Sequence, residues 1–78
     1  MRVLIVEDEP NLGRQLRATL EGAGYAIDLA TDGEDGHFLG STESYDAIIL
    51  DLNLPDSHGI ETVRRIRIEL AGTPVIAI

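Results

Sequence analysis

Short apolar segments that alternate with helix-patterned segments constrain the fold of this chain most. Residues 2–6 and 46–50 are apolar through their bodies and rich in Val, Ile and Leu, which is typical of strands covered on both faces. In residues 25–30 the larger apolar side chains Tyr25, Ile27 and Leu29 alternate with two alanines and the charged Asp28, a pattern that favours a half-exposed strand near a sheet edge. A fourth strand is expected over residues 74–78. Strands joined by helices in this order predict an α/β fold with right-handed crossovers and a parallel sheet.

The segments between the strands carry helix signals of unequal strength. The first helix is predicted from Pro10, which suits an initial turn, to the glycines Gly22 and Gly24. Its apolar face is a leucine stripe at helical spacing: Leu12, Leu16 and Leu20. A third helix is predicted from an N-cap at Ser57 to about Leu70.

The second helix is predicted from a cap at Thr31 or Asp32 to about Ser41. Three glycines lie inside it, and each costs roughly 1 kcal/mol relative to Ala in a helix interior. Phe38 and Leu39 are expected to form its core face, with Phe38 filling the core beneath it.

The predicted architecture is a flavodoxin-like, doubly wound, three-layer α/β/α domain spanning residues 1–78, with strand order 2-1-3-4. The net charge of −8 argues against this segment binding nucleic acid by itself. The absence of cysteine is consistent with a reducing cytoplasm. No apolar stretch approaches the roughly 20 residues of a membrane span, and we therefore expect a cytoplasmic protein that does not contact the membrane.

Acidic residues follow two of the apolar strands directly. Glu7 and Asp8 come after the first, and Asp51 comes after the third. In an open parallel sheet, ligands bind beyond the carboxyl ends of the strands. If these two strands are neighbours, the three carboxylates converge, repel one another and favour a divalent cation. The pattern predicts a phosphoryl-acceptor site.

The segments 6–9, 50–59 and 73–76 together resemble the receiver domain of two-component response regulators, and the resemblance runs along all 78 residues. It implies that Asp51 accepts a phosphoryl group from a sensor histidine kinase. It also implies that Mg²⁺ is held by Glu7, Asp8, Asp51 and the backbone carbonyl of Asn53, with Asp8 a direct ligand and Glu7 acting through water. The function implied is phosphorelay signalling, without turnover of a separate substrate. A longer parent would belong to the winged-helix branch of transcription regulators.

Some family features are not found in these 78 residues. The family has a Ser or Thr after its fourth strand and a Lys after its fifth, whereas this chain contains no Lys and ends within the predicted fourth strand. We therefore expect a receiver that stops before the family's fourth helix, fifth strand and fifth helix. An exposed apolar fourth strand invites edge pairing, so the first alternative is a switch-incompetent fragment that forms a homo-oligomer or a domain-swapped dimer.

The second alternative is an enzyme, a phosphatase of the haloacid-dehalogenase type. Such an enzyme also uses an Asp nucleophile at a strand tip, but it requires an acidic residue two positions later. Asn53 occupies that position here and cannot act as a general acid.

Overall fold

Four strands form one parallel sheet in the computed structural model, which describes residues 1–50 and 72–77. The strands are β1 (Arg2–Val6), β2 (Ala26–Ala30), β3 (Ala47–Leu50) and β4 (Val75–Ala77). Their order is β2-β1-β3-β4, which confirms the predicted order 2-1-3-4. The alternating strand β2 lies at an edge, as its pattern predicted.

The register brings three strand ends to the same level. Val6, the last residue of β1, pairs with Ala30 of β2 on one side and with Leu50 of β3 on the other. Each of these partners is also the last residue of its strand. The last residues of β1, β2 and β3 therefore lie at one common edge of the sheet.

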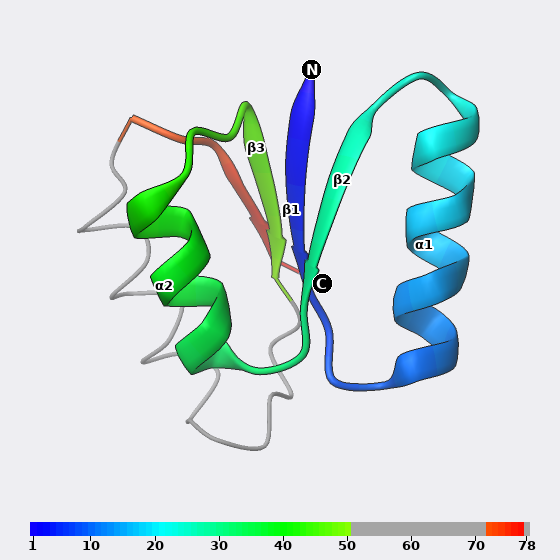
Figure 1. Ribbon diagram of the computed structural model, residues 1–78, viewed down its shortest axis with the longest axis horizontal. Helices are drawn as coiled ribbons and strands as arrows, with labels where there is room; N and C mark the ends of the chain where they lie inside the picture. Colours follow the sequence, from blue (N-terminus) through cyan, green and yellow to red (C-terminus); the bar gives the residue numbers. More distant parts are fainter. Residues whose placement is uncertain (51–71, 78) are drawn as a thin grey trace.

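Helices cover the two faces of the sheet. Helix α1 (Pro10–Gly22) lies on one face and helix α2 (Gly33–Thr42) on the other, so the molecule has three layers (Figure 1). Helix α1 begins where Pro10 predicted, and Asp32 is the N-cap of α2. Each helix enters from the carboxyl ends of the strands and runs back across the sheet, as a right-handed crossover requires.

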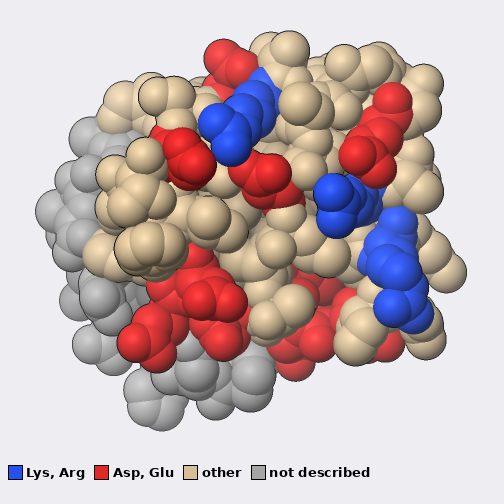
Figure 2. Space-filling view, viewed as in Figure 1, with Lys and Arg blue, Asp and Glu red and all other residues tan. Residues whose placement is uncertain are grey.

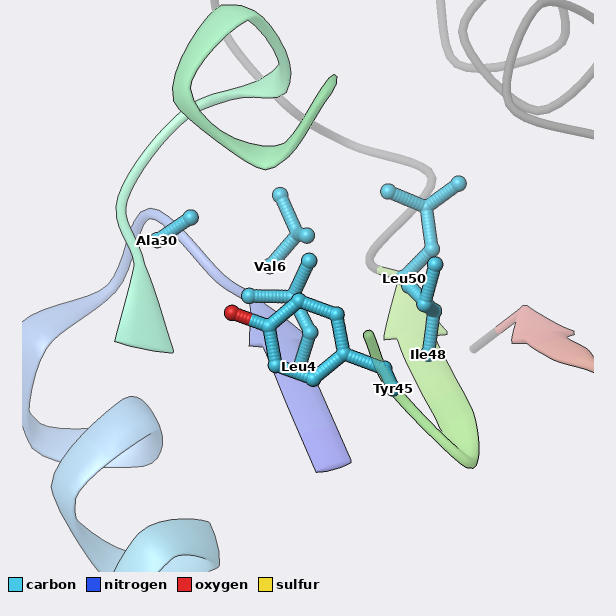
Figure 3. Packing of buried hydrophobic residues seen from close by; sticks show 6 residues of the cluster. All are labelled: Leu4, Val6, Ala30, Tyr45, Ile48 and Leu50. Carbon is cyan, nitrogen blue, oxygen red and sulfur yellow. The ribbon is translucent and has the colours of Figure 1, made fainter. Parts of the chain in front are cut away.

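The apolar strand residues divide between two cores because successive side chains point to opposite faces. On the α2 face the core contains residues of all three longer strands and the ring of Tyr45, as Figure 3 shows: Leu4, Val6, Ala30, Tyr45, Ile48 and Leu50. On the α1 face, Val3, Ile5 and Ile27 pack with the predicted leucines Leu16 and Leu20, whereas the predicted Leu12 is exposed. Full burial of a Leu or Ile side chain stabilises a fold by about 2 kcal/mol, so β1, buried on both faces, is the centre of the domain.

Helix α2 contacts the sheet through glycines. Gly33 and Gly36 are its buried residues, and a Cβ placed on Gly36 would lie only 2.6 Å from Cγ2 of Val6. The prediction that Phe38 fills the core was wrong, because 62% of Phe38 is exposed. Leu39 does pack against the core. The glycines, which lower helix propensity, let the helix backbone approach β1 closely, and Phe38 lies outside this contact.

The predicted third helix and residues 51–56 lie outside the described residues. In the part of the chain that the structure describes, none of the helices has the length and apolar character needed to span a bilayer.

Candidate functional site

The carboxyl ends of the strands carry the acidic residues singled out in the sequence. Glu7 and Asp8 follow Val6 of β1, and Val6 pairs with Leu50, the residue before Asp51. The predicted adjacency of the first and third strands is therefore confirmed. We call the loops at this end, residues 7–9 and 31–32, the carboxyl edge. Asp51 and Asn53 lie outside the described residues, and their roles stay predictions.

The two acids that follow β1 occupy different environments. Glu7 continues the ladder of β1, because its backbone N–H donates to the carbonyl of Ala30 at 2.9 Å. Its side chain is 3% exposed, and Oε1 accepts a hydrogen bond from the backbone N–H of Glu9 at 3.1 Å. Asp8 is exposed. The Glu7 carboxylate is thus buried and held by a hydrogen bond, whereas the Asp8 carboxylate is exposed to solvent.

The other acidic residues near this edge stabilise the first turns of the two helices. Glu9 caps α1, where its carboxylate accepts hydrogen bonds from the backbone N–H groups of Asn11 at 3.1 Å and Leu12 at 2.6 Å. Asp32 caps α2 by accepting from the N–H of Asp35 at 2.7 Å. Glu34 and Asp35 lie in the first turn of α2, where negative charge stabilises a helix.

The electrostatic field at this edge is set by acids and by helix N-termini. Acidic side chains gather at the lower end of Figure 2, which is the end where the strands terminate in Figure 1. Both helices begin there, and a helix N-terminus carries partial positive charge that favours phosphate. Arg2 and Arg17 are paired elsewhere, with Asp28 and Glu21. Asp8 forms no ion pair with any described residue.

The donor chemistry of the edge fits a hard divalent cation. Glu7 and Asp8 supply carboxylate oxygens, the ligands that Mg²⁺ prefers. Residues 1–50 and 72–77 contain no cluster of three or more His, Cys, Asp or Glu side chains that could hold a metal. Of the predicted ligands, Glu7 and Asp8 are among the described residues, and Asp51 and Asn53 lie outside them.

A family model described as the response regulator receiver domain matches residues 3–78. The chain belongs to this family. It is 45% identical over 76 residues to the transcriptional regulatory protein CusR of Escherichia coli K12. That alignment covers 97% of this chain and 34% of CusR, so the chain spans about a third of the length of this relative.

Solved structures resemble the receiver domain closely. The response regulator TrrA of Thermotoga maritima, in complex with Mg²⁺-BeF, matches with a TM-score of 0.92 and 36% identity, covering 97% of this chain and 66% of TrrA. TrrA in complex with the histidine kinase ThkA matches with a TM-score of 0.90 at the same identity and coverage. These matches confirm the predicted fold class.

A polar cluster at the other end of the receiver sheet was missed by sequence reasoning. Arg2 Nη2 donates to Asp28 Oδ2 at 2.7 Å, and the Tyr45 hydroxyl donates to the same oxygen at 2.7 Å. The Arg2 guanidinium lies 5.0 Å from the centroid of the Tyr45 ring and 3.9 Å from Glu43. We call these four residues the Arg2 cluster. The signal available in the sequence was Asp28, an acid in the middle of an otherwise apolar strand.

The Arg2 cluster shifts the titration of its members. Hydrogen bonds from Tyr45 and then from Arg2 hold the pKa of Asp28 below its usual value. Burial, followed by the hydrogen bond to Asp28, raises the pKa of Tyr45 to about 12. The hydrogen bond to Asp28 raises the pKa of Arg2. Because the pKa of Asp28 is lowered, its interactions with Tyr45 and Arg2 stabilise the fold at neutral pH.

Proposed function

We propose that this receiver domain, residues 1–78, accepts a phosphoryl group on Asp51 with the help of Mg²⁺ held by Glu7, Asp8, Asp51 and the Asn53 carbonyl. The observation that carries the proposal is the pairing of Val6 with Leu50. This register puts the ends of β1 and β3 at one edge of the sheet, and Asp51 follows Leu50 of β3 in the sequence. Open α/β sheets bind ligands at such an edge.

The chain's own residues supply a nucleophile and the acidic groups beside it in the proposed site. The Asp51 carboxylate gives an electron pair to phosphorus, and a P–O bond forms as the donor's bond to phosphorus breaks and its electrons leave with the donor group. Glu7, fixed by the N–H of Glu9, and the exposed Asp8 would hold the cation. When bound, the cation neutralises the repulsion between the carboxylate and the phosphoryl oxygens. The N-termini of α1 and α2 add positive potential at the same edge.

The proposed phosphoryl donor is a sensor histidine kinase. The similarity to TrrA, which was solved with the kinase ThkA, supports this partner. Similarity to CusR, a transcriptional regulatory protein, supports a role in transcription regulation, and we propose a cytoplasmic location. We propose no turnover of a separate substrate, because Asn53 cannot act as the general acid that an aspartyl phosphatase would need.

Incubation with MgCl₂ and acetyl phosphate, followed by intact-mass measurement, tests the proposal. The expected result is a gain equal to one phosphoryl group in the wild type and no gain in Asp51→Asn. Asp8→Asn should label more slowly, and chelation of Mg²⁺ should prevent labelling of the wild type. An unlabelled wild type, under conditions that label a full-length relative, would overturn the proposal.

We also propose that the chain self-associates through β4. Among the described strands, β4 pairs with β3 alone, and Ile76 is 54% exposed. An apolar edge of this kind favours strand pairing between chains. Sedimentation velocity should detect dimers or larger species in the wild type, and Ile76→Lys should shift the population toward monomer. A wild type that stays monomeric at high concentration would contradict this assignment.

A further inference from the structure

The first turn of α1 contacts the sheet at one buried position. Gly13 is the buried residue of this helix. A Cβ placed on Gly13 would lie 3.2 and 3.3 Å from the two methyl carbons of Leu29 and 3.8 Å from Cγ of Glu7. The helix backbone therefore lies against the aliphatic stem of a proposed cation ligand, with no room for a longer side chain between them.

Gly13 is also linked to the Glu7 carboxylate through Glu9. The N–H of Gly13 donates to the carbonyl of Glu9 at 2.9 Å, and the N–H of Glu9 donates to Oε1 of Glu7 at 3.1 Å. The Glu9 carboxylate caps the same turn. A displacement of this turn away from the sheet would therefore move the donor that holds the Glu7 carboxylate.

We propose that Gly13 is a positioning residue for the cation site, because its lack of a side chain lets α1 hold Glu7 in place. The proposal rests on the proposed function, in which Glu7 takes part in cation binding. Hydrogen-bond partners that orient a ligand change metal affinity by about 10- to 100-fold when they are altered. Gly13 acts one step further from the cation, through Glu9, so we expect an effect at the lower end of that range.

The two substitutions that test the proposal differ in size. A methyl group at position 13 requires the Leu29 methyls to move by a few tenths of an ångström, whereas a leucine requires the helix to move. Gly13→Leu should therefore weaken Mg²⁺ binding by about tenfold, and Gly13→Ala by less. Both residues favour helix more than glycine does, so a loss of helix propensity does not explain either effect.

Two further variants serve as control and rescue. Gly22 lies in the same helix, and a Cβ there meets nothing within 4 Å, so Gly22→Leu should bind Mg²⁺ as the wild type does. Leu29→Ala removes the methyl groups that a side chain at position 13 would meet. The double variant Gly13→Leu with Leu29→Ala should recover most of the lost affinity, a rescue that general destabilisation would not produce.

The experiment is an Mg²⁺ titration followed by NMR of the backbone amides of Glu7, Asp8 and Glu9. It requires no phosphorylation, and each variant is measured at a temperature where its amide spectrum is that of a folded domain. In metal-free samples the Glu9 amide should shift in Gly13→Leu and return in the double variant. That amide reports the hydrogen bond to Glu7 directly.

The outcomes separate the two proposals. If wild-type amides do not respond to Mg²⁺, the cation site itself fails and the role of Gly13 fails with it. If the wild type binds and Asp8→Asn does not, while Gly13→Leu binds like the wild type, the cation site stands and the role of Gly13 is overturned. If Gly13→Leu does not fold, wild-type affinity and an unshifted Glu9 amide in Gly13→Ala would overturn it instead.

Discussion

Two acidic residues of this domain, Asp28 near the amino end of the sheet and Asp8 at its carboxyl edge, have opposite environments. At the amino end, Asp28 receives hydrogen bonds from Arg2 and Tyr45, and Arg2 also lies near Glu43. At the carboxyl edge, Asp8 is exposed and forms no ion pair with a described residue. The charge of Asp28 is balanced within the fold by Arg2, and this interaction stabilises the fold. Asp8 has no such partner among the described residues, so its carboxylate is available to a cation from solution.

The largest effect expected from this contrast comes from Tyr45. Tyr45→Ala should lower the free energy of unfolding by about 3 kcal/mol, because a ring that is only 9% exposed is lost from the core. Tyr45→Phe should cost about 1 kcal/mol, since it removes the hydrogen bond to Asp28 alone. Urea denaturation measures both. A Tyr45→Ala variant as stable as Tyr45→Phe would show that the amino end does not hold the fold.

A pair of charge-matched variants compares the ends directly. Asp28→Asn should destabilise the domain by about 1.5 kcal/mol, because the carboxylate that accepts from both Arg2 and Tyr45 becomes neutral. Solvent screening limits the effect, since the Asp28 side chain is 37% exposed. Asp8→Asn removes the same charge at the carboxyl edge and serves as the control in the same urea experiment. Equal losses in both variants would remove the distinction between the ends.

The stability of the domain should depend on pH at high pH because Tyr45 titrates there. The pKa of Tyr45 is raised to about 12 in the folded state, so its contribution is complete below the ordinary value of about 10 and is lost as pH rises toward about 12. The loss should reach about 1 kcal/mol near pH 11. The chain has no lysine to titrate in this range. Stability measured against pH should therefore be flatter in Tyr45→Phe than in the wild type.

Asp28 should make the stability of the domain depend on pH in the opposite direction, with a loss as the pH falls. Its pKa is lowered in the folded state, so its contribution is present above the unfolded value of about 3.9 and is lost as pH falls through the folded value. Asp28→Asn should remove this part of the acid dependence, whereas Asp8→Asn should leave it in place. If Asp28→Asn lost stability at low pH as the wild type does, Asp28 would not be the source of this pH dependence.

The smallest expected effect is on the metal-free stability of Asp8→Asn. Relief of repulsion with neighbouring acids should raise the free energy of unfolding by no more than about 0.5 kcal/mol. With Mg²⁺ present the wild type should gain thermal stability, because a ligand that binds only the folded state stabilises it, and Asp8→Asn should gain little. Melting temperatures with and without Mg²⁺ give both quantities. Equal stabilisation of the two proteins would place the cation elsewhere.

Much of this fold could be predicted because its signals are local. The leucines of α1 repeat at helical spacing, and the apolar runs of β1 and β3 stand out without any partner. The contacts of α2 could not be predicted in the same way. A glycine that lowers helix propensity and a glycine that allows close packing look identical in a sequence, and only the position of Val6 beneath Gly36 separates them.

The candidate site, like the fold, could be predicted only in part. The order of apolar strand and acidic residue located Glu7 and Asp8 at the carboxyl edge. Their unequal burial was not predicted, because it depends on the hydrogen bond from Glu7 to Ala30 of β2 and on the position of Glu9. The Arg2 cluster joins residues from three distant segments, and no local pattern reports such a contact.

The close approach of the Gly36 backbone to the methyl groups of Val6 restricts which substitutions the two positions can accept. A larger residue at either position leaves no space for the other, so an increase in volume at one must be matched by a decrease at the other. In a library randomised at both positions, the surviving sequences should therefore show reciprocal sizes.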